Sequence, residues 1–332
     1  MRSTSANTVG RRRVPGAALA GITALVSGVS VFVNGYGVRA GAAPAVYTTA
    51  KNIVAVAVLS LVAAIGWSVR ARRAGSAAAN FVTTAPEARE VPATRRWAEW
   101  LGFVYVGVIG GGLAFVLFFD GLAQSESTPA AFWRDTLVLW VAMLAVLFLR
   151  ERLRWWNVAA MVLLFSGEVV VSGGVGQLAA NRGEVDVLVS SVLWAIEVVV
   201  ARRLLRTHSP ATLSTVRMGL GALTLIFYLG ASGSLDQLGA MNADQWHWAL
   251  WTGVLLSMYV AAWMSALARA RAVDVTSVLA SSALLTWLLQ VLAGTTMVSG
   301  DAIGLVLIGA GATLVLVEAR GRASWRGRTL SA

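Results

Sequence analysis

PAVYTTAK at positions 44–51 and PATLSTVR at 210–217 are two copies of one pattern, 166 residues apart. Proline, alanine, a hydroxyl residue, threonine and a cation occupy the same places in both copies. Each copy opens a long apolar run and places its cation, Lys51 or Arg217, seven residues inside that run. The flanking segments recur at nearly the same offset, so the sequence predicts an internal repeat.

The composition is that of a membrane protein. Of the 332 residues, 57% are hydrophobic and 13% are charged, with a mean hydropathy of +0.71; soluble domains carry about 25% charged residues. The apolar residues form long blocks, which is typical of a polytopic helical membrane protein. Ten spans are expected near 14–34, 44–66, 100–120, 129–149, 155–173, 185–201, 210–230, 246–267, 275–294 and 300–318. The first span also has the basic flank of a signal peptide, but the repeat uses it as a full helix.

The arginines predict the orientation of these spans. With the N-terminus inside, the inner segments hold 22 arginines, and the outer segments hold Arg39 and Arg182. This bias follows the positive-inside rule and places both termini in the cytoplasm. The net charge of +11 is then explained by the orientation of the spans and by contact with anionic lipid, without nucleic-acid binding.

The predicted fold is therefore an all-α polytopic membrane protein with ten transmembrane helices in two inverted five-helix repeats. An odd number of helices in each copy makes the second copy enter from the opposite side, an arrangement that builds alternating-access transporters. We expect a cytoplasmic tail over 1–13, repeats over 14–173 and 185–318, an outer linker over 174–184 and a basic cytoplasmic tail over 319–332.

Two motifs give the chain a family resemblance. FLRERLRWWNVAAMVLLFSGEVVV (148–171), with Glu151 at its acidic turn, and LWAIEVVVARR (193–203) resemble the EamA-type branch of the drug/metabolite transporter superfamily. The resemblance covers about residues 17–318. It implies export of small solutes through a cavity walled mainly by helices 1, 3, 4, 6, 8 and 9. One departure is Thr295, which stands where the second copy would have its acidic turn residue.

Charged residues inside the spans are the first site candidates, because such residues are costly in lipid and face the bundle interior. Lys51, the only lysine, lies about 10 Å below the outer face, and Arg134 and Asp135 lie about 8–9 Å below it. Glu168 has a similar depth, so the four side chains are able to form one neutralising cluster. Asp120 and Glu126, nearer the outer mouth, are able to join it.

The inner half has a smaller counterpart. Arg217 lies about 10 Å and Glu197 about 7 Å above the inner face, so the two are able to pair across the sixth and seventh spans. Either group of charges then has two open interpretations. In the first, the charges line the solute path, gate it or bind a charged solute. In the second, they are buried ion pairs that fix helix packing, or side chains that snorkel to the interface.

Aromatic and amide residues of the expected cavity wall are the remaining candidates, because ring faces bind cations and buried amides need partners. They are Asn34, Tyr36, Trp133, Trp194, Tyr259, Trp263 and Gln290. The glycine motif IGGGLAF (109–115) indicates a close helix contact.

The function that these features favour is secondary transport. We expect an exporter of a small metabolite, amino acid or drug-like solute in the plasma membrane, with proton coupling left open. No cysteine, metal-site pattern or nucleotide-binding motif occurs, so no cofactor and no catalysis are expected. The alternatives are a membrane-embedded enzyme acting on lipid-linked substrates, and a membrane subunit or sensor that transports nothing.

Overall fold

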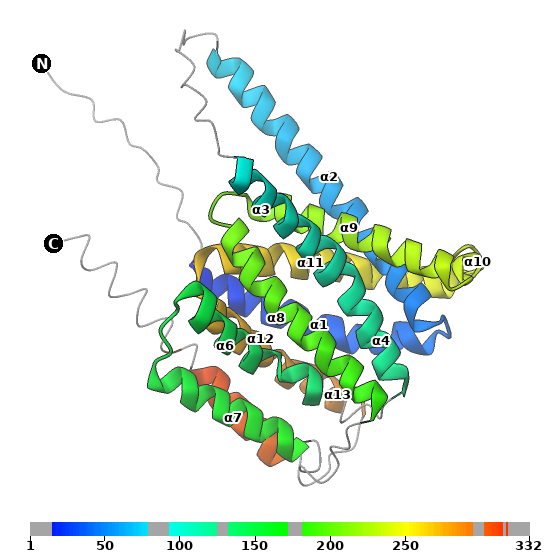
Figure 1. Cartoon of the computed structure of the whole chain (residues 1–332). Coiled ribbons are helices and arrows are strands. Elements are labelled where there is room, and N and C mark those ends of the chain that lie inside the picture. The colour runs from blue at the N-terminus through cyan, green and yellow to red at the C-terminus, as the bar shows by residue number, and fades with distance from the viewer. Residues whose placement is uncertain are drawn as a thin grey trace, which may run out of the picture.

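The fold is a bundle of long helices (Figure 1). This computed structural model describes residues 15–78, 93–124, 132–171, 181–294, 302–314 and 317. The helices of the first half are α1 (Gly16–Arg39), α2 (Pro44–Ala78), α3 (Ala93–Val104), the π-helix η1 (Tyr105–Leu113), α4 (Ala114–Gln124), α6 (Leu137–Leu149) and α7 (Trp155–Val171). Those of the second half are α8 (Arg182–Leu204), α9 (Pro210–Ala231), α10 (Leu235–Gly239), α11 (Ala243–Arg269), α12 (Ala272–Ala280), α13 (Ser282–Leu292) and an apolar helix over Ala302–Leu314.

Each of the ten expected spans coincides with helix in the described residues, but not all are equally suited to cross a membrane. Seven helices are long and apolar enough: Gly16–Arg39, Pro44–Val69, Arg96–Gln124, Phe132–Leu149, Pro210–Ala231, Ala243–Arg269 and Ala272–Leu292. The apolar helices Trp155–Gly167 and Ala302–Leu314 are shorter. In α8, every 18-residue window holds at least three charged residues. The chain is thus a multi-pass membrane protein, and ten crossings stay a prediction.

The helices begin where the sequence supplies caps. Pro210 opens α9 behind Ser209, whose hydroxyl accepts the Thr212 N–H at 3.1 Å. Asn242 and Gln245 form a capping box at the start of α11. The second copy of the repeated pattern, PATLSTVR, therefore begins a helix, and local hydrogen bonds fix its first turn.

The bundle has two distinguishable ends. We call the end with residues 150–154, 202–209 and 269–271 the arginine-rich end, and the end with 39–44 and 231–243 the opposite end. Side chains join separate loops at each: Arg271 donates to the Arg152 carbonyl at the first, and Gln245 donates to the Ala40 carbonyl at the second. The arginine bias predicts that the arginine-rich end is cytoplasmic.

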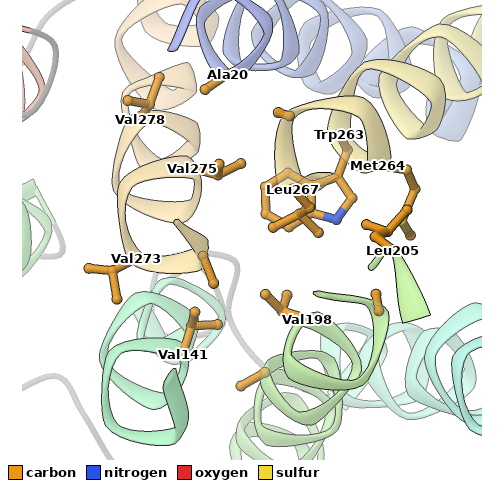
Figure 2. Packing of buried hydrophobic residues seen from close by; sticks show 14 of the residues in the cluster. Ala20, Val141, Val198, Leu205, Trp263, Met264, Leu267, Val273, Val275 and Val278 are labelled. Carbon is orange, nitrogen blue, oxygen red and sulfur yellow. The ribbon is translucent and has the colours of Figure 1, made fainter. Parts of the chain in front are cut away.

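The largest buried hydrophobic cluster lies nearer the arginine-rich end. Trp263, Met264 and Leu267 of α11 pack there against Val198 of α8 and Val275 of α12 (Figure 2). Trp263 is 6% exposed. Trp263, a predicted residue of the solute path, is therefore part of the packed core.

Several sequence predictions fall outside the described part of the chain. They are the two tails, Glu126, Thr295, the Glu168 side chain, and most of the linker 174–184.

Candidate functional site

Lys51 is buried, and among the described residues its side chain has no partner of opposite charge. Its side chain is on α2, and the residue is 8% exposed. The Nζ atom donates to Asn34 Oδ1 on α1 at 3.1 Å and lies 5.4 Å and 5.6 Å from the ring centres of Tyr47 and Phe119. Within the described residues, no hydrogen bond or ion pair joins Lys51 to an acidic side chain. An amide oxygen and two ring faces therefore stabilise its ammonium.

The expected joint cluster of Lys51 with Asp135 is not formed among the described residues. Asp135 instead pairs with its neighbour Arg134, whose Nε and Nη2 atoms donate to Oδ1 at 2.9 Å and 2.7 Å. Because the two residues are neighbours in the sequence, their side chains can pair whatever the positions of the other helices. Lys51 and Asp135 therefore have different partners, and the predicted contributions of Glu126 and the Glu168 side chain lie outside the described residues.

The predicted pair of Arg217 and Glu197 is present and buried. Arg217 Nη2 donates to Glu197 Oε2 at 3.1 Å, and Nε donates to Oε1 of the same carboxylate. The two residues are 7% and 3% exposed. Such a two-bond contact uses the planar geometry of the guanidinium and satisfies both carboxylate oxygens. The pair holds α8 and α9 together and is electrically neutral.

Two phenylalanines bring the cations of the two repeat copies to one helix face. Phe115 and Phe119 lie one turn apart on α4, with ring centres 6.3 Å apart and nearly parallel planes. Arg217 lies over the Phe115 ring at 5.7 Å, and Lys51 lies over the Phe119 ring at 5.6 Å. Trp194 of α8 meets the Phe115 ring edge-on at 5.2 Å. We call Lys51, Arg217, Glu197, Phe115 and Phe119 the central site.

The π-helix η1 supplies the backbone of this site. The Gly110 carbonyl accepts hydrogen bonds from Trp194 Nε1 at 3.0 Å and from Arg217 Nη2 at 3.3 Å. A Cβ atom at Gly110 would lie 2.3 Å from Glu197 Oε2, and one at Gly111 would lie 2.5 Å from the Arg217 carbonyl oxygen. The glycines that predicted a close helix contact therefore make one, between η1 and the charged pair.

Of the predicted residues Tyr259 and Trp133, only Tyr259 lies beside the central site. Tyr259 of α11 interacts electrostatically with Arg217, Glu197 and Arg134, and its ring is stacked with Trp263 at 6.2 Å. Trp133 points elsewhere, since its Nε1 atom donates to Glu184 Oε2 at 2.9 Å. Tyr259 is thus a neighbour of the site, whereas Trp133 fixes the start of α8.

Two other predicted residues lie apart from the central site. Tyr36 is 37% exposed and is stacked on Trp248 at 5.5 Å, near the opposite end. Gln290 is exposed on α13. The structure therefore does not bring Tyr36 or Gln290 to the buried charges.

Three important residues escaped sequence reasoning. Phe115 and Phe119 look like ordinary apolar residues, and only their four-residue spacing shows that they share a helix face. Glu184 is 2% exposed, with Trp133 and Asn181 as partners, although it is the last residue of the predicted linker 174–184. Its only sequence signal is its place three residues after a helix-capping asparagine.

A polar network closes the arginine-rich end. Both Glu151 oxygens accept backbone N–H groups in the first turn of α12, from Ala272 at 3.0 Å and Val273 at 3.4 Å. Arg271 binds Asp274 and donates to Asn157 Oδ1 at 3.2 Å. The acidic turn of the first half thus caps a helix of the second half.

Charged and aromatic side chains make up the central site. No group of three or more His, Asp or Glu side chains in the part described is arranged to hold a metal ion. Apolar helices around a charged and aromatic interior define a multi-pass membrane protein.

The family of the chain follows from its matches. Residues 14–173 and 181–317 match the EamA-like transporter family. Because these ranges take in most of the sequence, the chain belongs to the EamA-like transporter family.

Individual relatives agree with this family. Two uncharacterised transporters of Archaeoglobus fulgidus are 28% identical over 151 residues (44% of this chain, 54% of the relative) and 26% identical over 186 residues (54% and 62%). The uncharacterised transporter YyaM of Bacillus subtilis is 26% identical over 131 residues (38% and 43%). The matches span about half the length of these relatives. A crystal structure that is 19% identical has the same fold, with a TM-score of 0.66 over 92% of this chain and 97% of that one.

Proposed function

We propose that the protein is a secondary transporter that exports a small solute bearing an anionic group, by alternating access across the plasma membrane. The observation that carries the proposal is the buried ammonium of Lys51, which has no acidic partner in the described residues. A charge at the centre of a membrane helix costs about 2.5–3.5 kcal/mol on insertion scales. A function that requires the cation is a direct reason to retain it.

The electrostatic balance of the site supports an anionic solute. Arg217 is neutralised by Glu197, and Arg134 pairs with Asp135. Lys51 is left as the cation whose charge the described side chains do not balance. A carboxylate or phosphate of a solute would balance the charge of Lys51 and accept a charge-assisted hydrogen bond from its ammonium. The Phe119 and Tyr47 rings would exclude water from this contact.

The pattern of helix contacts supports two equivalent halves. If the two halves are equivalent, each helix contact should have a counterpart in which every span is replaced by the span five places away. The contact α1·α11 then corresponds to α4·α8, the contact α2·α11 to η1·α9, and the contact α6·α8 to α1·α13. All six of these pairs are in contact. The pairs α2·α9 and α6·α12 are also in contact and exchange into themselves. Inverted repeats would produce this pattern, and alternation between equivalent states is what they permit.

The packing at the arginine-rich end supports one particular state of the cycle. The hydrophobic cluster around Trp263, Leu267 and Val275 packs α11 and α12 against α8 (Figure 2). Glu151 ties the first half to α12 of the second half across the same end. We interpret this conformation as closed toward the cytoplasm.

Solute identity and the role of Lys51 are tested together. Cells overproducing the wild type, Lys51→Met or the control Arg39→Gln are grown, and anionic metabolites in the medium are compared by mass spectrometry. Arg39 is a suitable control because it is an exposed cation near the same end, bonded to its own helix. The wild type and the control should enrich the same solute, and Lys51→Met should not.

Purified protein in liposomes then separates transport from the alternatives. The enriched solute, radiolabelled, should cross the membrane unchanged with the wild type, and its flux should fall at least about tenfold with Lys51→Met. Chemical turnover of the solute would indicate an enzyme. Equal flux through Lys51→Met would show that the lysine has only a structural role.

Proton coupling belongs to the same proposal. Glu197 is the acidic group of the buried pair, and Asp135 is that of the half-buried pair with Arg134. If either carries the proton, an inward proton gradient should accelerate export, and the Asp135→Asn or Glu197→Gln variant should lose that acceleration while downhill flux continues.

A further inference from the structure

A large apolar groove lies on the side of the bundle, and no residue of the central site lines it. It has a volume of about 1130 Å³ and runs between α2, α3 and α9. These three helices lie together at the upper side of the molecule in Figure 1. The volume exceeds the roughly 300–1,000 Å³ of most small-molecule sites.

Each helix contributes one stripe of side chains to the groove. On α9 the stripe runs from Thr212 through Val216, Gly219 and Leu223 to Ile226. Successive residues of the stripe are three or four positions apart in the sequence, so their side chains share one face of the helix. The stripe rises through fourteen residue steps along the helix, or about 21 Å. That length exceeds the roughly 15 Å of one leaflet of the hydrocarbon core.

The groove is apolar along its length and polar at one end. Leu223 is 62% exposed and Trp100 is 68% exposed, so the walls are open to the side that faces lipid in a membrane. At the arginine-rich end lie Arg96, Glu99 and His208. His208 Nε2 is 3.3 Å from Glu99 Oε2.

Arg96 provides the charge complementarity. It is exposed on the first turns of α3, and among the described residues it has no hydrogen-bond or ion-pair partner. A guanidinium at the level where apolar walls end is suited to a phosphate, because it donates two parallel hydrogen bonds to one anion. Basic pockets between transmembrane helices on the cytoplasmic side bind lipid head groups in this way.

We propose that this groove is a specific phospholipid site in the inner leaflet, with an acyl chain along the α9 stripe and the phosphate at Arg96. The bound lipid would bridge α2 to α3 and α9. The inner-leaflet assignment follows the orientation expected from the arginine bias. This site is separate from the central site, and its occupancy is independent of which solute is transported.

A glycine in the stripe allows the groove to be filled cleanly. A Cβ atom at Gly219 would meet no atom within 4 Å, so a side chain can start there without a clash, and Gly219→Trp should place an indole in the groove. Gly230 is also free of neighbours within 4 Å and lies on the same helix outside the groove, so Gly230→Trp is the matched control. Ala57→Trp fills the groove from α2 if Gly219→Trp does not fold.

The experiment measures retained lipid. Each variant is purified in mild detergent and examined by native mass spectrometry for bound phosphatidylglycerol. The wild type and Gly230→Trp should retain it, and Gly219→Trp or Ala57→Trp should not. Arg96→Gln should weaken retention about tenfold, as expected for one charge-assisted contact, and Arg39→Gln should not.

A phospholipid carrying a diazirine on its acyl chain locates the site in liposomes. Labelled peptides should come from α9 and α3 and disappear in Gly219→Trp. Labelling spread evenly around the bundle would overturn the proposal, as would unchanged lipid retention in folded Gly219→Trp. Cross-links between groove residues and the segment 79–92 would also overturn it, because the chain itself would then occupy the groove.

Discussion

Lys51 and Arg217 hold equivalent places in the two copies of the opening sequence, but their charges are stabilised differently. Arg217 has a carboxylate partner with two hydrogen bonds. Lys51 has one amide oxygen and two aromatic rings. This asymmetry is what distinguishes a structural pair from a binding candidate, since only the unbalanced charge has capacity for a ligand.

The paired charges make a prediction about stability. Arg217→Met leaves Glu197 buried without its partner and should lower the stability of the folded protein by about 3–5 kcal/mol. The double variant Arg217→Met/Glu197→Gln removes both charges and should recover most of that loss. Thermal unfolding in detergent measures both effects. A double variant that is less stable than Arg217→Met would show that the pair does not act as a unit.

The second residue prediction concerns Lys51 itself. Because Lys51→Met removes a buried charge and leaves no acidic group unpaired in the described residues, the melting temperature should stay the same or rise. The measurement is scanning fluorimetry of the same samples used for flux. A large fall in melting temperature would indicate that the ammonium mainly fixes α1 to α2 through Asn34.

The element that matters most to the site is the π-helix η1. A run of three glycines lets α9 approach so closely that Gly111 and Gly221 face each other backbone to backbone. π-Helical segments are rare and are often found at functional sites. Here the segment presents the Gly110 carbonyl to Trp194 and Arg217, which connects the local geometry to the charged pair.

Substitution of Gly111 tests this contact. The added methyl of Gly111→Ala would lie 2.5 Å from the Arg217 carbonyl oxygen, and backbone atoms cannot turn aside. Overpacking of this kind should destabilise the protein by about 1–3 kcal/mol. Gly219→Ala is the control, since its methyl meets open space and should stabilise the helix by up to about 1 kcal/mol. Equal melting temperatures for the two variants would contradict the close approach.

At the scale of the whole molecule, the two halves interlock at the arginine-rich end. Glu151 caps α12 across the bundle, and the hydrophobic cluster lies directly behind that contact. Breaking the cap should favour opening at this end, because the first turn of α12 loses its acceptor and its favourable negative charge.

Cysteine accessibility measures this opening, since the chain has no native cysteine. Val275→Cys is fully buried and should react slowly with maleimide. Adding Glu151→Ala should accelerate the reaction several-fold, and adding Asp236→Ala on exposed α10 should not. Unchanged labelling in the Glu151→Ala background would show that the cap does not hold this end closed.

The orientation of the whole bundle is tested in the same way. Ala43→Cys and Thr207→Cys are exposed in loops at the two ends. In intact cells, an impermeant maleimide should label Ala43→Cys, and Thr207→Cys should react only after lysis. The reverse result would overturn the cytoplasmic assignment of the arginine-rich end.

The sequence alone determined the helical membrane class and the helix positions, and it indicated that Glu197 and Arg217 are close enough in depth to pair. Long apolar blocks, capped starts and costly buried charges are local properties, and each constrains structure without knowledge of the neighbours. Only the tertiary structure decided that Arg134 binds Asp135, that Phe115 and Phe119 join the two cations, and that Trp263 belongs to the core. The physical reason is that helix rotation sets which face meets which neighbour, and equal depth along the membrane leaves that rotation open.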